Sequence, residues 1–250
     1  MIGGRSQTPV KGSVHWLLAA ILLWEAVELL RPSGSATLWG WPLGFFDLFL
    51  LLAVPLLLAV AFIRLFVAVI QSGYGSLNAY TVTSSPWAWL FWTGLVLTIV
   101  GHGEHVGAHL LNQTVPEVVR NGEFGAMVRF FDESLGPWVA GAGLFLMTSV
   151  IIVLGQGSAQ RVIDGERFLL IVGSLVTFGA GILYVGVEGR LLIPAILAAW
   201  GMVAVAFRLL AAWEVSHDPV SLFVVPGAAA AGSILFAWGL LVGGQPTWPW

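Results

Sequence analysis

Seven long apolar stretches dominate this chain and limit what it can fold into. The hydrocarbon core of a bilayer is about 30 Å thick, and about 20 apolar residues in a helix cross it. Backbone groups in lipid must be bonded within their own segment, so continuous apolar runs predict helices. We therefore predict an all-α integral membrane bundle that forms a single domain over residues 1–250. The predicted transmembrane helices are roughly 14–31, 43–70, 86–111, 135–155, 167–188, 190–213 and 219–243.

The boundary between the fifth and sixth spans rests on the tight connection Glu188-Gly189-Arg190. If the chain does not turn there, the number of transmembrane helices falls from seven to six.

Composition excludes several classes of protein. Charged residues make up 9% of the chain and hydrophobic residues 58%, whereas a soluble domain carries about 25% charged residues. The net charge of −3 provides no basic surface for nucleic acid. Cysteine is absent, which excludes disulfides, thiolate metal sites and cysteine nucleophiles. Lys11, the single lysine, precedes the first span, so a retinal Schiff base in the seventh span is excluded.

Ionisable side chains within spans are costly and are functional candidates by default. In an up-down bundle, most of those in this chain fall at one end, whichever side of the membrane that end faces. These residues are Glu25, Glu28, Asp47, His102, Glu104, His105, His109, Asp132, Glu133 and Glu188.

The distribution of Lys and Arg favours a cytoplasmic N-terminus. With the N-terminus inside, six of these residues lie inside and four outside, in the direction of the positive-inside rule.

The most specific motif is Gly101-His-Gly-Glu-His-Val-Gly-Ala-His109. Its histidines are spaced i, i+3 and i, i+4, so they share one face of a helix. Neutral imidazoles at this spacing can bind one metal ion. The same pattern also suits a hydrogen-bonded cluster, a proton relay or axial ligation of haem. Gly103 and Gly107 form a G-x-x-x-G pattern, which predicts close approach of a neighbouring helix.

The same motif, followed by Phe130-Phe131-Asp132-Glu133, resembles an uncharacterised bacterial family of polytopic membrane proteins. That resemblance covers about 40 residues and implies a bacterial inner-membrane location. The family pattern has an asparagine where this chain has His109, and a histidine near Pro137-Trp138.

A looser resemblance is to alkaline ceramidases and adiponectin-receptor-like membrane hydrolases. It implies a zinc ion held by three histidines with a carboxylate nearby. Those proteins carry H-x-x-x-H in the last span, and the last predicted span of this chain has no histidine.

The leading hypothesis is a metal-dependent membrane hydrolase that acts on a lipid-like substrate, with zinc as the expected metal. A bound metal would lower the pKa of its water towards 7. The assigned metal ligands are His102, His105, His109 and Glu28, and the assigned catalytic residues are Asp132 and Glu133. Asp132 could alternatively complete the metal shell, and both acids could simply cap a helix N-terminus.

Two non-enzymatic hypotheses remain open. The chain could be a proton-coupled transporter or relay that needs no metal. It could equally be an accessory subunit of a membrane complex, with partner subunits around it in the lipid bilayer.

Overall fold

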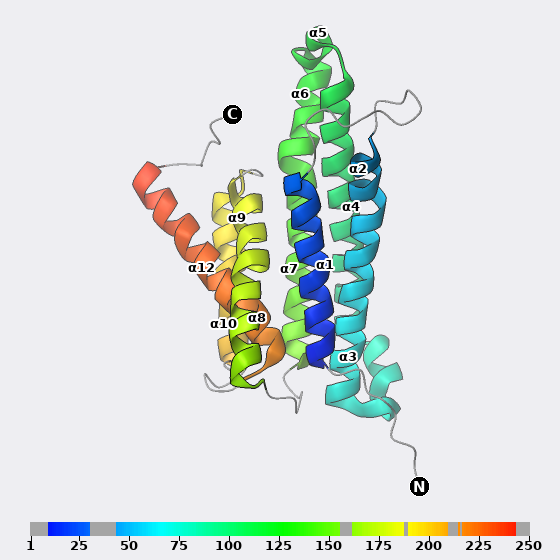
Figure 1. Ribbon diagram of the computed structural model, residues 1–250, viewed down its shortest axis with the longest axis vertical. Coiled ribbons are helices and arrows are strands. Elements are labelled where there is room, and N and C mark those ends of the chain that lie inside the picture. The colour runs from blue at the N-terminus through cyan, green and yellow to red at the C-terminus, as the bar shows by residue number, and fades with distance from the viewer. Residues whose placement is uncertain are drawn as a thin grey trace.

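The computed structural model describes the backbone of residues 10–30, 44–155, 162–187, 190–209, 215 and 217–243. These residues form helices joined by short turns, and none of them forms a strand (Figure 1). Each of the seven predicted segments contains a described helix. Their bounds are α1 Val10–Leu30, α2 Phe45–Leu48, η1 Phe49–Ala53, α3 Val54–Thr83, α4 Pro86–Thr114, α5 Glu117–Arg120, α6 Glu123–Phe130, η2 Phe131–Leu135, α7 Gly136–Gly155, α8 Asp164–Ser174, η3 Leu175–Gly179, α9 Ala180–Val187, α10 Leu192–Leu209 and α12 Pro219–Val242.

Five helical segments of the described chain are long and apolar enough to cross a membrane, fewer than the seven predicted. They are Val10–Val27, Phe46–Gly73, Glu123–Gly155, Asp164–Val187 and Pro219–Val242. Helix α10 is apolar but shorter, and α4 carries the histidine motif, whose polar side chains lower its hydropathy.

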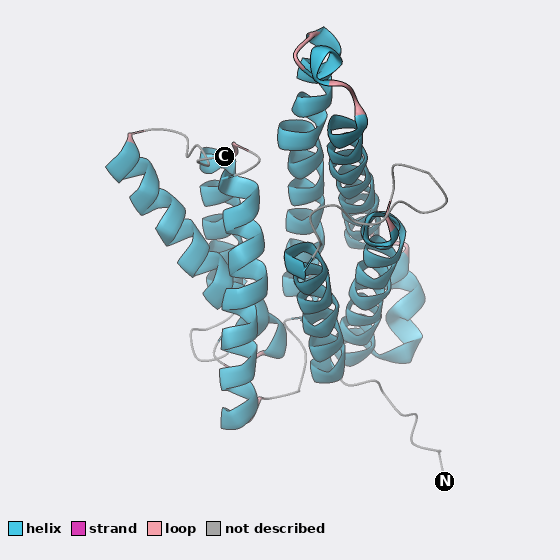
Figure 2. Cartoon of the chain, turned by 45° about the horizontal axis from the view of Figure 1, so that its top comes forward, coloured by secondary structure: helices cyan, strands magenta, loops and turns pink. Residues whose placement is uncertain are grey.

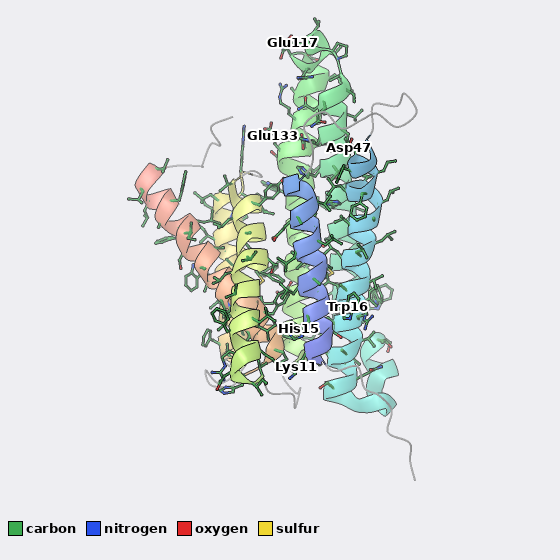
Figure 3. The ribbon with its side chains drawn as sticks, viewed as in Figure 1. Lys11, His15, Trp16, Asp47, Glu117 and Glu133 are labelled. Atoms are coloured by element: carbon green, nitrogen blue, oxygen red, sulfur yellow. The ribbon has the colours of Figure 1, made fainter. Side chains whose placement is uncertain are left out.

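The two ends of the bundle carry different side chains. Lys11, His15 and Trp16 lie at one end, whereas Asp47, Glu117 and Glu133 lie towards the other (Figure 3). At the first end, Lys11 on α1 pairs with Glu166 on α8 at 2.7 Å. Asp47 and Glu133, two acidic residues of the predicted polar end, therefore lie away from the end that carries Lys11.

A continuous apolar core lies between these ends. It includes the fully buried rings of Phe62, Phe66, Phe91 and Phe223. Phe66 on α3 stacks on Phe91 on α4 with ring centroids 4.0 Å apart. This packing holds α4 against α3 below the histidine motif.

Helices α4 and α7 lie side by side in both views and approach closely on glycines (Figures 1 and 2). A Cβ atom on Gly101 would lie 2.6 Å from the carbonyl oxygen of Gly136, and one on Gly94 would lie 2.7 Å from that of Gly143. The prediction that Gly103 and Gly107 form the close contact is wrong. A Cβ on either would meet nothing within 4 Å, because both face away from α7.

The segment 112–134, which lies between the predicted spans 86–111 and 135–155, is largely helical. Helix α4 continues to Thr114, and α6, η2 and α7 form one continuous helical rod from Glu123 to Gly155. Asp132 and Glu133 therefore do not open a helix. The capping alternative for these two residues is wrong because they lie in the middle of this rod.

Three π-helical turns, η1, η2 and η3, interrupt the α-helices. A π-turn inserts a residue into the regular hydrogen-bond ladder and often occurs at functional sites. Each of these turns lies at a polar contact between helices. The contacts join His102 to the Leu50 carbonyl of η1, His105 to the Asp132 carbonyl of η2, and the Gly227 N–H to the Ser174 hydroxyl before η3.

Candidate functional site

Helix α4 carries all three histidines of the motif in its second half. The helix starts at Pro86, after Ser85, whose hydroxyl accepts a hydrogen bond from the Ala88 N–H. Its 29 residues span about 43 Å at 1.5 Å per residue. This length places the motif at the same end of the bundle as η2, which packs against α4.

His102 has different hydrogen-bonding and packing partners from the other two histidines. Its ring is buried and lies 2.9 Å through Nε2 from the carbonyl oxygen of Leu50. A carbonyl can only accept, so Nε2 carries the proton and donates. The ring also packs edge-on against Trp24, with centroids 5.4 Å apart. His102 therefore joins α4 to η1 and α1.

His105 and His109 converge on the carboxylate of Asp132. Nδ1 of His105 lies 3.1 Å from Oδ1 of Asp132, and Nδ1 of His109 lies 3.4 Å from Oδ2. The carboxylate is 8% exposed, so it meets the two imidazoles with little solvent around it. Burying a carboxylate in this way is costly unless it is paired and hydrogen-bonded.

Hydrogen bonds fix which nitrogen of each ring carries the proton. Nδ1 of His105 also lies 2.7 Å from the Asp132 carbonyl oxygen, which only accepts, so Nδ1 is the donor. In the neutral ring, Nε2 of His105 is then an acceptor, and the Tyr184 hydroxyl lies 3.1 Å from it. In the same way, the Gln113 amide donates to Nε2 of His109 at 2.8 Å, which leaves Nδ1 to donate to Asp132. The result is the chain Tyr184–His105–Asp132–His109–Gln113, which we call the polar chain.

Two backbone features bring Asp132 to α4. The π-turn η2 carries Asp132, and Gly136 follows it directly. A Cβ atom on Gly136 would lie 2.7 Å from the backbone nitrogen of His105. Only glycine allows this approach, so Gly136 sets the distance between Asp132 and His105.

Glu133 does not join the polar chain. Its carboxylate pairs with the guanidinium of Arg190 at 3.3 Å, on the surface between η2 and the start of α10. Among the described residues no contact joins Glu133 to the histidines, so its assignment as a catalytic residue stays a prediction. The side chain of Glu28 and all of Glu188 lie outside the described part of the chain.

No metal-binding arrangement is found among the described residues: no group of three or more His, Asp or Glu side chains is placed to hold an ion. His102 is turned to Leu50, and Nδ1 of His105 donates to a carbonyl oxygen. The predicted four-ligand set is therefore not brought together by the described side chains.

Sequence reasoning missed two members of the polar chain. Gln113 follows His109 at i, i+4, a spacing that places the two on the same helix face. Tyr184 is 79 residues from His105 and carries no sequence signal for this contact.

No protein-family model, curated protein or solved structure matches this chain.

Proposed function

We propose that this chain is a membrane-embedded hydrolase that acts on a lipid-like substrate, with His105 as its general base. The observation that carries the proposal is the fixed imidazole of His105. Its Nδ1–H is held by Asp132, and its Nε2 acceptor faces the half-exposed Tyr184. A base oriented by a third group and facing a hydroxyl is the usual arrangement of an activated nucleophile.

In this mechanism, Nε2 of His105 takes a proton from a water molecule as its oxygen attacks the substrate. The imidazolium that forms is stabilised by the Asp132 carboxylate, and the same proton then passes to the leaving group. In this step the Tyr184 hydroxyl gives up its bond to Nε2, which has a single lone pair, and orients the water instead. Because the polar chain lies at one end of the bundle, we propose that water reaches it from the membrane surface and the substrate from the bilayer.

We also propose the full topology as seven crossings in the bacterial inner membrane, with the N-terminus inside. The five long apolar segments, the apolar α10 and the continuous α4 support this count.

Replacing His105 with glutamine tests the general base. The detergent-purified variant is expected to hydrolyse long-chain 4-nitrophenyl esters and fluorescent phospholipids about 10²–10⁴-fold more slowly than wild type, because glutamine cannot accept the proton. The matched control is His15→Gln, since His15 lies at the other end of the bundle (Figure 3). Equal rates for both variants, or no hydrolysis of any probe by wild type, would contradict the proposal.

A metal-dependent hydrolase is the second candidate, and one observation favours it. The nitrogen–oxygen separations of 3.1 and 3.4 Å around Asp132 match those of neighbouring ligands on one ion with bonds of about 2.0–2.1 Å. In this form a deprotonated nitrogen of each imidazole and the Asp132 carboxylate would hold zinc, which would supply an activated water. Glu28 remains the predicted additional ligand.

Elemental mass spectrometry separates the two candidates. If the second candidate holds, wild type carries about one zinc per chain, and a His105→Ala, His109→Ala variant carries none. If the first holds, hydrolysis survives dialysis against a chelator and added zinc is not retained. Activity that depends on zinc retained at this site would replace the first candidate with the second.

A further inference from the structure

A surface pocket of about 350 Å³ lies beside the polar chain. It is formed by the end of α6, by η2 and by Arg190, two residues before α10. Its lining residues are Ala126, Arg129, Phe130, Glu133, Ser134 and Arg190. Its volume is within the range of small-ligand sites. Glu133 follows Asp132 directly, so the pocket and the polar chain share the turn η2.

The charges in the pocket favour an anion. Two guanidinium groups line it against one carboxylate. Arg129 donates one bond to the Arg120 carbonyl oxygen at 2.8 Å, and Arg190 pairs with Glu133. A guanidinium has five N–H donors, and its planar shape matches the oxygens of phosphate or carboxylate. Ser134 adds a hydroxyl that can donate to the same anion.

Arg190 is held in an unusual conformation. Its φ is +53°, in the left-handed region that non-glycine residues seldom occupy. The Arg190 N–H donates to the Val187 carbonyl oxygen at 3.4 Å, and the following Leu191 N–H donates to that of Gly186. The backbone of this tight connection therefore presents the guanidinium towards Glu133 and the pocket. These two bonds form the Schellman pattern of a helix end, in which the residue at this position takes the left-handed conformation.

The edge of the pocket is apolar and accessible. Phe130, which lines it, is 54% exposed, and Met127, one turn earlier on α6, is 51% exposed. An anionic group between the arginines would therefore have exposed apolar surface beside it. This combination suits an amphipathic ligand with a charged head and a hydrocarbon chain.

We infer that this pocket binds the phosphate group of an anionic amphiphile, with Arg129 and Arg190 as its ligands. The description of that amphiphile as the substrate rests on the proposed function, whereas the binding itself does not. Glu133 competes with the phosphate for Arg190, so ligand binding breaks the Glu133–Arg190 ion pair.

Native mass spectrometry of the detergent-purified full chain measures this binding without any hydrolysis. The probes are dioleoylphosphatidylglycerol, zwitterionic dioleoylphosphatidylcholine and inorganic phosphate as a competitor. Wild type is expected to retain phosphatidylglycerol in preference to phosphatidylcholine. An Arg129→Gln, Arg190→Gln variant is expected to bind phosphatidylglycerol about ten-fold or more weakly, because charge-assisted bonds to the phosphate are lost. The matched control is Arg208→Gln, an exposed arginine at the far end of α10, which is expected to bind as wild type does.

A third variant changes affinity in the opposite direction. Glu133→Gln removes the competing carboxylate, so it is expected to bind phosphatidylglycerol several-fold more tightly than wild type. A damaged fold cannot produce tighter binding, so this result separates a specific site from loss of structure.

The outcomes are distinct. Competition by inorganic phosphate at concentrations similar to the lipid would support the phosphate site and assign its ligand to the soluble phase. Equal retention of both lipids by wild type, or unchanged binding by the double variant, would overturn the inference. If phosphatidylglycerol binds as expected while His105→Gln leaves hydrolysis unchanged, the pocket stands and the proposed hydrolase fails.

Discussion

Replacing Gly101 with leucine is expected to abolish the native packing of α4 on α7. Even the first side-chain atom would lie 2.6 Å from the Gly136 carbonyl oxygen, and its other neighbours are backbone atoms of Ala140. Backbone in the middle of a helix cannot move aside as a side chain can. Overpacking a core typically costs about 1–3 kcal/mol, and we expect at least the upper value here. The measurement is the thermal unfolding midpoint in detergent, together with the elution profile on size exclusion.

The chain contains its own matched control for this variant. Gly103 lies two residues further along the same helix, and a Cβ atom there would meet nothing within 4 Å. Gly103→Leu is therefore expected to unfold at or above the wild-type midpoint, because leucine also has a higher helix propensity than glycine. If both variants unfold at the same temperature as wild type, the helices do not pack on Gly101.

Replacing Asp132 with asparagine is expected to cause a large loss of hydrolytic activity. The two side chains are nearly the same size. Asp132 accepts from both imidazoles, one on each carboxylate oxygen. Asparagine presents an NH₂ group to one of them, which places two donors against each other and favours the wrong tautomer. In Ser-His-Asp triads the same change lowers kcat by about 10⁴. We expect at least a hundred-fold loss of hydrolysis, and a stability loss of about 1–3 kcal/mol from the unsatisfied buried donor.

Asp164→Asn is the control, since that carboxylate is 97% exposed and pairs with Arg167 on the same helix. Nitrogen-15 chemical shifts of His105 provide a readout that a purely structural role would not move. They report whether the ring proton stays on Nδ1 when Asp132 is changed. A folded Asp132→Asn protein with wild-type activity would show that the polar chain is structural.

The helices were predictable because the bilayer imposes their length and hydropathy on the sequence. The sequence also predicted that polar residues lie at one end of the bundle, because in an up-down bundle the position of a residue along its span gives its end. The described contacts at Asp47, His105, His109 and Asp132 all lie at that end. Helix boundaries near η2 were not predictable, because Asp132 and Glu133 look like helix-start residues although the helix continues through them.

The sequence could not predict that His102 and His105 have different partners, because the two residues share one face of the helix. All three histidines start from nearly the same face of α4, and their side-chain partners then differ. The Leu50 carbonyl oxygen in η1 accepts a hydrogen bond from His102, and Asp132 contacts the other two histidines. Such partners belong to other helices, and their positions depend on how those helices pack.

The sequence alone determined that this chain is helical and has segments long and apolar enough to cross a membrane, because lipid requires apolar length and internally bonded backbone. Only the tertiary structure decided which polar residues meet. Glycines at Gly101 and Gly136 set how closely α4 and α7 approach, and the inserted residue of η2 turns Asp132 towards His105 and His109. Tyr184 completes the polar chain from a helix that is distant in sequence. The packing of the helices places its hydroxyl beside His105, and no spacing along the chain indicates this contact.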